Sequence, residues 1–389
     1  MELSKMSQNK YVFAQIFDTI NKYEFDSCID KYNGNHRVKT FRCWEQFLVM
    51  SFAQLSYRES LRDIELCLNG MRDKLYRCGI RSSIARSTLA KANEIRNWKM
   101  YADFASGLIE TALPLHKGDN SLAQELKTII YAFDSTTIDL CLELFPWAKF
   151  RKTKSAVKVH VLLNIDGAIP EFISISKGNL QDVNMLDQIQ YKPGCFYLVD
   201  KAYVDFKRFY KIELQKAFFV TRAKENLAYT VENENVIDIE SGIIKDELIV
   251  MKWHHGKRKY KGQLRRIEYQ DALSGRELTF LTNHFTIKAI TVASLYKERW
   301  KVELFFKWIK QNLKIKRFYG NSENAVKIQV WIAICDYLLL AIIRKQLKIK
   351  MSLTQMMQVL SLNLFEKCRI SELFINQETK QVSNQATLF

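Results

Sequence analysis

The chain has 389 residues, of which 48% are hydrophobic and 12% are aromatic, and it carries a formal net charge of +17 at pH 7. A disordered chain has few apolar residues, so this composition indicates a globular protein of two or three domains. A basic excess of this size favours a polyanionic partner, most often nucleic acid, over a neutral one.

The cysteines and the apolar stretches bear on the cellular compartment. Eight cysteines are scattered without a Cys-x-x-Cys pair, which argues against a zinc ribbon or a disulfide framework and indicates a reducing cytosol. The N-terminus lacks the apolar core of a signal peptide. The most apolar stretch, residues 330–343, is short and contains Asp336, so we expect a buried helix and no membrane partner.

Residues 1–112 are predicted to form a helical N-terminal DNA-binding domain. Apolar positions recur at helical spacing through residues 40–70, with Ser56 and Glu59 as a capping box and Gly70 as a stop.

A second helical segment follows within the same region. Residues 77–98 read as a turn followed by a short helix, capped by Ser87 or Thr88, with exposed cations at Arg86, Lys91 and Arg96. This pattern is compatible with a helix-turn-helix and equally with an ordinary helix pair. On the basic background we expect Arg86 and Lys91 to contact DNA.

From about residue 124 the sequence pattern predicts strands. Stretches rich in β-branched and aromatic residues predict three strands, of which the last two are joined by a turn at Asp166 and Gly167. A short helix, a strand, a longer helix and a further strand complete a mixed α/β sheet. We therefore divide the chain into a first core part at 124–223, a β-rich insertion at 224–288, a second core part with the catalytic helix at 289–350 and a helical tail at 351–389.

Two aspartates follow apolar strands of this sheet. Asp134 comes after residues 129–133 and Asp200 after residues 195–199, so neighbouring strands would bring both acids to one edge, where open sheets place their sites. Each aspartate taken alone is more often a turn-forming residue at a strand end.

A helix over residues 296–316 offers a third acid. Tyr296, Glu303 and Lys310 are spaced by seven, and Arg299 precedes Glu303 by four, so one helix would align them in a row. An apolar stripe docks this helix on a core: Val302, Phe305, Phe306, Ile309 and Leu313. The alternative is a solvated helix laced with charge pairs, since Glu298 and Lys301 also alternate in sign.

Together the three acids predict phosphodiester chemistry. Asp134, Asp200 and Glu303 could hold two divalent metal ions about 3.5 to 4 Å apart, which would activate the attacking oxygen and stabilise the leaving one. Carboxylate oxygens favour Mg²⁺, and we expect Mn²⁺ to substitute for it. On the same helix we expect Tyr296, Arg299, Lys307 and Lys310 to contact DNA.

Several motifs resemble one family. Tyr296, Arg299, Glu303 and Lys310 reproduce the Y-(2)-R-(3)-E-(6)-K signature of the DDE transposases grouped around insertion sequence 4. "YAFDST" and "LVDKAY" are similar to the acidic motifs of that family, with Ala202 where Gly is frequent. Further similar segments are "GNLQD", "FFVTRAK", "RESLRDIE" and "ARSTLAKANE".

The resemblance implies an α/β fold in which an RNase H-like catalytic core is interrupted by a β-rich insertion and preceded by an all-helical domain. It also implies cut-and-paste transposition in a synaptic homodimer, with strand nicking, a DNA hairpin and strand transfer. The partners would be the terminal inverted repeats and a target duplex, in the bacterial cytoplasm at the nucleoid.

The insertion is expected to contribute to DNA binding as well. Members of the family stack a flipped base on a tryptophan of the insertion, and Trp253 is the candidate here. Residues 249–266 hold seven cations and no acid, among them Lys257, Arg258 and Lys259, which we expect to contact the DNA backbone.

Two other classes of protein stay open at this point. One is an RNase H-like nuclease or resolvase that cuts without strand transfer, which the insertion and the helical domain disfavour. The other is a non-catalytic DNA-binding relic, which the intact set of Asp134, Asp200 and Glu303 disfavours.

Overall fold

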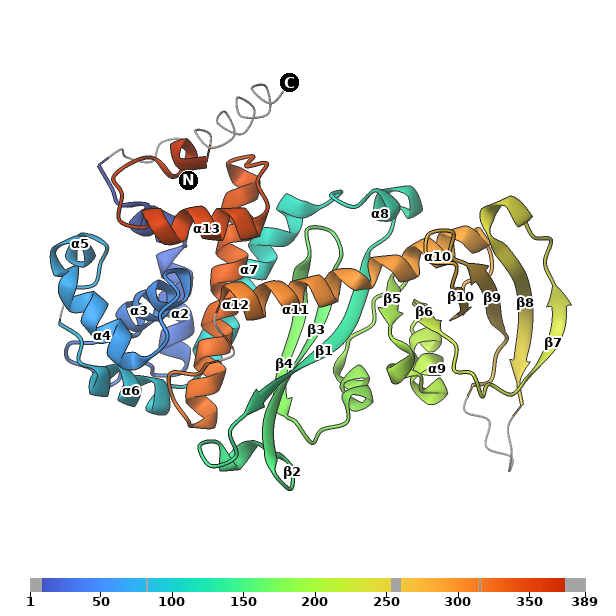
Figure 1. The fold of residues 1–389 in the computed structure, drawn as a ribbon, viewed down its shortest axis with the longest axis horizontal. Helices are drawn as coiled ribbons and strands as arrows, with labels where there is room; N and C mark the ends of the chain where they lie inside the picture. The colour runs from blue at the N-terminus through green and yellow to red at the C-terminus, as the bar shows by residue number, and fades with distance from the viewer. Residues whose placement is uncertain (1–8, 82, 253–259, 314, 316, 375–389) are drawn as a thin grey trace. The chain divides into compact units, whose positions relative to one another are not determined.

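Figure 1 shows the computed structural model of the chain, which describes residues 9–81, 83–252, 260–313, 315 and 317–374. The chain forms two compact units. The sheet unit comprises Lys117–Thr137 and Ala156–Phe305, and the helical unit comprises Met1–His116, Ile138–Ser155 and Phe306–Phe389. Both units are therefore assembled from segments that are distant in the sequence.

A mixed sheet forms the centre of the sheet unit. Its strands follow the order β2-β3-β1-β5-β6-β10-β9-β8-β7, with β4 paired to β3, and β2 belongs to the segment Ile138–Ser155 of the helical unit. The pairs β1–β5 and β5–β6 are parallel, whereas β3–β4 and β6–β10 are antiparallel. The bounds are β1 Ile130–Leu140, β2 Lys149–Arg151, β3 Lys154–Asn164, β4 Ile169–Lys177, β5 Phe196–Val199, β6 Phe218–Arg222, β7 Tyr229–Glu234, β8 Ile243–Met251, β9 Leu264–Gln270 and β10 Glu277–Thr282.

This architecture confirms the predicted fold class, a mixed α/β core of RNase H-like type with a helical N-terminal region. The β3–β4 turn lies where the sequence predicted it, with positive φ at Gly167 and Ala168. Positive φ at both positions suits the twist of a tight antiparallel hairpin.

The parallel strands are buried on both faces, which explains their almost uninterrupted apolar sequences. Tyr131 and Phe133 of β1 share a buried cluster with Phe209 of α9 (Phe206–Leu214). The alternating residue Ala132 is also fully buried, and α10 (Ala289–Glu298) packs against β5 and β6. Short helices complete the unit: α8 Ser121–Leu126, η3 Asp182–Gln188, η4 Lys201–Tyr203 and η5 Ile239–Ser241.

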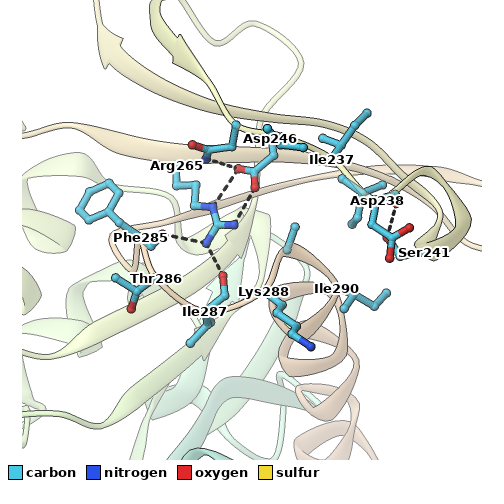
Figure 2. A pocket seen from close by; sticks show the side chains of 14 residues that line it. Ile237, Asp238, Ser241, Asp246, Arg265, Phe285, Thr286, Ile287, Lys288 and Ile290 are labelled. Atoms are coloured by element: carbon cyan, nitrogen blue, oxygen red, sulfur yellow. Dashed lines mark hydrogen bonds and ion pairs between the residues drawn. The ribbon is translucent and has the colours of Figure 1, made fainter.

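The β-rich segment at 224–288 continues the core sheet, because its strand β10 pairs with β6 of the core. From β10 the sheet extends outward through β9, then β8, then β7. A buried ion pair ties this extension to the start of α10 (Figure 2). The Arg265 guanidinium lies 2.6 and 2.8 Å from the two oxygens of Asp246 and donates to the carbonyls of Phe285 and Ile287. These residues line a cavity of about 420 Å³. Arg265 thus fixes the backbone just before α10 begins.

The helical unit is built around α12. Its helices are α1 Val12–Asp18, α2 Lys22–Lys31, α3 Cys43–Leu55, α4 Leu61–Gly70, α5 Arg72–Arg77, α6 Arg86–Ile95, α7 Lys99–His116, α12 Glu323–Gln346 and α13 Leu353–Asn363, with the short η2 Pro146–Ala148. Within the described residues α12 alone is long and apolar enough to cross a membrane, and almost all of its apolar part is buried inside the protein. This burial agrees with the predicted core helix, and all eight cysteines are free.

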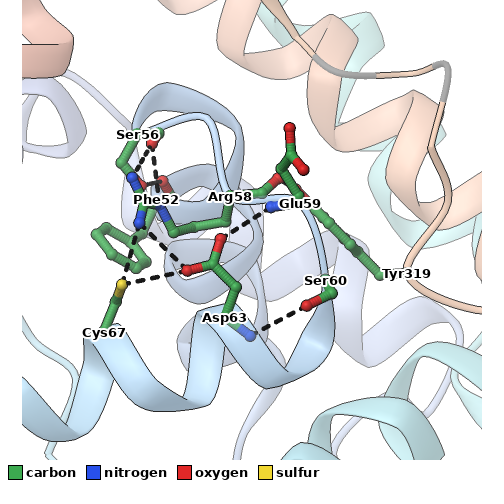
Figure 3. Close-up of polar contacts among 8 residues, drawn as sticks. All are labelled: Phe52, Ser56, Arg58, Glu59, Ser60, Asp63, Cys67 and Tyr319. Carbon is green, nitrogen blue, oxygen red and sulfur yellow. Dashed lines mark hydrogen bonds and ion pairs between the residues drawn. The ribbon is translucent and has the colours of Figure 1, made fainter.

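The connection between α3 and α4 differs from the predicted capping box (Figure 3). Ser56 is the C-cap of α3, and both its N–H and its hydroxyl donate to the Phe52 carbonyl. Ser60 instead caps α4 by accepting from the Asp63 N–H at 3.1 Å. The Asp63 carboxylate in turn pairs with Arg58 at 3.3 Å, which holds the connection in place. The predicted end at Gly70 is confirmed.

The predicted helix after residue 77 is α6, with two corrections. Ala85 is its N-cap, so Ser87 and Thr88 lie inside the helix. Arg86 and Lys91 are exposed as expected. Arg96 is buried instead, because its guanidinium donates to the Gln46 side chain at 2.9 Å and to the Phe41 carbonyl.

Candidate active site

Strand register places the two aspartates beside each other. In the parallel pair β1–β5, Phe133 lies opposite Val199. The next residues, Asp134 and Asp200, therefore leave the paired segment at the same level. One detail of the sequence prediction is wrong: β1 continues to Leu140, so Asp134 lies within the strand. Asp134 marks the end of the parallel pairing, because Asp200 already turns into η4.

The predicted single helix over 296–316 is two helices. α10 ends at Glu298 and α11 spans Trp300–Asn312, with Arg299 between them. The Arg299 N–H bonds to the Tyr296 carbonyl and the Val302 N–H to the Arg299 carbonyl, each three residues back and at 3.2 Å. The prediction of one continuous helix is therefore wrong, because a tighter turn at Arg299 interrupts it.

Arg299 nevertheless connects the acids. Its Nη1 lies 3.3 Å from Oδ2 of Asp134, and its Nη2 lies 2.7 Å from Oε1 of Glu303. The Tyr296 hydroxyl donates to Oδ2 of Asp200 at 3.4 Å, and the Arg299 guanidinium lies over the Tyr296 ring. Five residues predicted from the sequence thus come together within the sheet unit.

Burial and mutual repulsion set the protonation of this cluster. Burial, with a smaller contribution from the negative charges of Glu303 and Asp200, raises the pKa of Asp134 to about 6. The Ser135 N–H and the Arg299 guanidinium oppose this shift of the Asp134 pKa. Burial likewise raises the pKa of the Tyr296 phenol to about 12, so this hydroxyl remains a donor at neutral pH.

Tyr203 is a neighbour of the acids to which the sequence analysis gave no role. Its hydroxyl lies 3.3 Å from Oδ1 of Asp134 and 3.1 Å from Oγ of Ser135. Asp200 accepts from the Ala202 N–H at 3.0 Å and so caps the short helix that carries Tyr203. The signal was present in "LVDKAY", since a residue three positions after an N-cap returns toward it.

The carboxylates of this cluster are the predicted ligands of divalent metal ions. In the arrangement seen here, no three metal-binding side chains of the described residues are placed to hold an ion. Arg299 lies between two of the carboxylates instead. Three ionised carboxylates and one guanidinium carry a net charge of −2, and carboxylate oxygens are the ligands that Mg²⁺ prefers. The residues therefore fit a hard divalent cation that would replace Arg299 as the counter-charge.

A basic cavity of about 470 Å³ has Lys201, the neighbour of Asp200, in its wall. Its other cations come from separate elements and are Arg222, Lys224 and Arg266. Because these residues converge only through the fold, the sequence alone did not group them. Arg266 is already paired with Glu247 at 2.6 Å, whereas Lys201 and Lys224 are exposed.

The remaining predicted DNA contacts belong to other parts of the chain. Lys307 and Lys310 lie on α11, and Arg86 and Lys91 lie on α6, all in segments assigned to the helical unit. Four candidates lie outside the described residues: Trp253, Lys257, Arg258 and Lys259.

Comparison with known proteins identifies the family. Residues 125–339 match the Transposase DDE domain, and residues 8–81 match a domain of unknown function, DUF4372. A transposase named y4zB from Sinorhizobium fredii is 33% identical over 282 residues, covering 72% of this chain and 77% of the relative. The transposase named for insertion sequence element IS5377 of Geobacillus stearothermophilus is 29% identical over 216 residues, covering 55% and 56%.

Two further similarities were found. The transposase named for element IS4SA of Synechocystis is 25% identical over 281 residues, covering 70% of this chain and 76% of the relative. A cryo-EM structure of the piggyBac transposase synaptic complex with hairpin DNA aligns over 95% of this chain and 83% of its own, with TM-score 0.43 and 10% identity. The domain match spans more than half of the chain, and the chain therefore belongs to the DDE transposase family of insertion sequences.

Proposed function

We propose that this transposase carries out metal-dependent cut-and-paste transposition, with Asp134, Asp200 and Glu303 as its catalytic acids. The observation that carries the proposal is the meeting of these three carboxylates around Arg299 and Tyr296. A set of acids from two strands and a helix, held by packed apolar segments, is suited to phosphodiester chemistry.

Mg²⁺, or Mn²⁺ in its place, would be held by the carboxylates of Asp134, Asp200 and Glu303 and would supply Lewis-acid charge to the reacting phosphate. The protein's own contribution is positioning. Arg299 has a buried Nε–H without a partner in the described part of the chain. A buried guanidinium donor left free beside the acids is suited to hold a phosphate oxygen of the scissile strand.

Tyr296 and Tyr203 have supporting roles in this proposal. The Tyr296 hydroxyl holds Asp200, and the Tyr203 hydroxyl lies against Asp134. Both phenols keep their protons at neutral pH, because burial raises the pKa of each well above neutrality. They orient the acids and leave proton transfer to the carboxylates and to water.

The reaction sequence has four steps. Water attacks a backbone phosphorus at the element's end and a 3′-hydroxyl leaves. That hydroxyl attacks a phosphorus of the opposite strand, which forms a hairpin on the element's end and releases the flanking DNA with a 3′-hydroxyl. Water then attacks the hairpin phosphodiester and frees the 3′-hydroxyl of the element again. In the last step this 3′-hydroxyl attacks a phosphorus of the target DNA, and a 3′-hydroxyl of the target leaves. The partners are the terminal inverted repeats, a target duplex and a second copy of the chain in a synaptic dimer. The reaction takes place in the bacterial cytoplasm, at the nucleoid.

The other regions of the chain defined from the sequence would supply further DNA contacts. The helical domain at 1–112 would bind the ends through Arg86 and Lys91, and the helix of the second core part would contact the backbone through Lys307 and Lys310. The insertion at 224–288 and the tail at 351–389 complete the division.

A strand-joining assay tests the proposal. Duplexes from the DNA flanking the gene are incubated with Mg²⁺ and a supercoiled target plasmid, and the products are resolved on denaturing gels. The account predicts nicks, a hairpin-sized product and end DNA joined to plasmid. Cleavage without joining would indicate a nuclease, and binding without cleavage would indicate a relic.

A further inference from the structure

A strongly basic hairpin lies outside the candidate active site and outside every DNA contact named above. It joins β1 to β3 and is defined here as the basic hairpin, residues 146–154. Four of its side chains are exposed cations: Lys149, Arg151, Lys152 and Lys154. No Asp or Glu occurs between Glu143 and Asp166. None of the four cations pairs with an acid of the described residues.

The stability of the hairpin itself does not explain these residues. Arg151 lies directly opposite Lys154 in the β2–β3 pair, and like charges in that position are destabilising. Lys152 and Thr153 form the turn, and neither has the positive φ that favoured two-residue hairpin turns require. The tip therefore concentrates repulsive charge that a bound polyanion would relieve.

The base of the basic hairpin is firmly attached within the helical unit. The Trp147 indole N–H donates to the Asn321 carbonyl at 2.6 Å. Two residues earlier, the Phe145 ring packs edge-on against the Phe318 ring, with 6.2 Å between the ring centroids. The Ser155 hydroxyl donates to the Phe145 carbonyl at 2.9 Å. The exposed tip is thus presented from an anchored base.

The anchor places the basic hairpin beside the connection between α11 and α12, in which Asn321 and Phe318 lie. The exposed Arg317 of that connection pairs with Glu59 at 2.6 Å, so its charge is already balanced. The four cations of the basic hairpin are therefore the charges that call for an external partner.

We propose that the basic hairpin binds the phosphate backbone of double-stranded DNA. The inference rests on the proposed function and adds a binding surface to it. Lys and Arg side chains that bind phosphate supply affinity and position without reading sequence. A two-stranded ribbon is also narrow enough to follow a major groove, which is about 12 Å wide.

Salt-dependent binding tests the proposal without knowledge of the terminal repeats, because backbone binding is independent of sequence. The variant replaces Lys149, Arg151, Lys152 and Lys154 with Gln. Its matched control replaces four exposed lysines of other elements that form no ion pair with described acids: Lys99, Lys207, Lys216 and Lys348. Fluorescence anisotropy with a random 30-base-pair duplex gives Kd across a range of KCl concentrations.

The slope of log K against log salt should become shallower by about 0.9 for each phosphate that the protein no longer neutralises, so the slope of the hairpin variant should fall by roughly two to four. The control variant should keep the wild-type slope. An unchanged slope in the hairpin variant, or an equal change in the control, overturns the proposal. Thermal unfolding by circular dichroism verifies folding, and the single turn substitution Lys152→Glu, expected to weaken binding at least severalfold, serves if the fourfold variant misfolds.

The binding test of the basic hairpin can fail or succeed independently of the nicking test of the proposed function. Nicking is measured on the same preparations with DNA from the gene's flanks. A wild-type protein that binds the random duplex but never nicks DNA would refute the catalytic assignment and leave the result for the basic hairpin intact. A protein that nicks DNA while the hairpin variant binds like wild type would refute only the basic hairpin.

Discussion

Arg299 forms an ion pair with Asp134 across 165 positions of sequence, with 3.3 Å between Nη1 and Oδ2. The same guanidinium holds Glu303 at 2.7 Å, so one side chain joins the first and last acids of the cluster. A planar fork can bind both carboxylates at once, whereas an ammonium group is a single point charge.

Arg299→Lys is therefore expected to retain most DNA binding and to slow strand cleavage. A displacement of about 1 Å in the reacting groups can reduce a rate roughly a hundredfold. Lys310→Ala, in contrast, should weaken complex formation more than the chemical step. Single-turnover cleavage on pre-formed complexes, beside a binding titration, measures both. If both variants lose only affinity, Arg299 does not act in the active site.

Tyr203→Phe tests whether the buried hydroxyl positions Asp134. The variant removes the hydrogen bonds to Oδ1 of Asp134 and Oγ of Ser135, and this should lower the free energy of unfolding by about 0.5 to 1.5 kcal/mol. We expect cleavage to slow and its pH profile to shift, because the environment of Asp134 changes.

Tyr191→Phe is the matched control. Tyr191 lies in the same buried cluster and donates a single hydrogen bond, to the Leu186 carbonyl at 2.9 Å. It should lose similar stability and cleave at the wild-type rate. Equal rates in the two variants would assign Tyr203 a structural role only.

Asp134 makes the metal-free protein sensitive to pH. Burial raises its pKa to about 6, so the folded state holds this proton more tightly than the unfolded chain. The resulting stabilisation is fully present below about pH 4 and is lost as pH rises through about 6, amounting to at most about 3 kcal/mol. Asp134→Asn should lack this part of the slope when stability in EDTA is measured by urea unfolding.

Added Mg²⁺ should act in the opposite direction with pH. Metal ions bind the deprotonated carboxylate, so the stabilisation that Mg²⁺ confers should grow as pH rises through about 6. A constant effect of Mg²⁺ between about pH 5 and pH 8 would contradict the assignment of Asp134 as a ligand.

Removing one partner of the buried pair Arg265–Asp246 should be strongly destabilising, although the pair as a whole adds little net stability. Arg265→Met leaves Asp246 buried without its partner, which costs about 3 to 5 kcal/mol. The double variant Arg265→Met, Asp246→Leu should recover much of this loss. Lys211→Met, which breaks an exposed pair with Asp187, should cost only about 0 to 1 kcal/mol. Chemical denaturation of the four proteins measures the differences, and equal losses for Arg265→Met and Lys211→Met would contradict the burial argument.

Sequence reasoning succeeded where a short pattern determines position. The apolar runs before Asp134 and Asp200 predicted neighbouring strands, and the strand register then places both acids at one level. The chemistry of the three acids could be predicted without knowing which side chains contact them. The spacing of Arg299 and Glu303 by one helical turn likewise survived the break in the helix, since their ion pair spans four residues.

At Ser56 it failed for a local reason: Ser56 reads as a helix start, but its hydrogen bonds to the Phe52 carbonyl make it the C-cap of α3. Elsewhere it failed where distant partners decide the local structure. Arg96 reads as a solvated cation, but Gln46 and the Phe41 carbonyl, 50 and 55 residues earlier, bury it. Tyr203 was overlooked because its partner Asp134 is 69 residues away.

The central claim is that Asp134, Asp200 and Glu303 form one active site. Three alanine variants, tested by single-turnover nicking of flank-derived duplex in Mg²⁺ and in Mn²⁺ beside a binding titration, address it most directly. The account predicts that each variant binds DNA within a few-fold of wild type, because the basic surface supplies affinity. Each should show no detectable nicking. Cleavage at the wild-type rate by any one of the three would remove that residue from the site and contradict the claim.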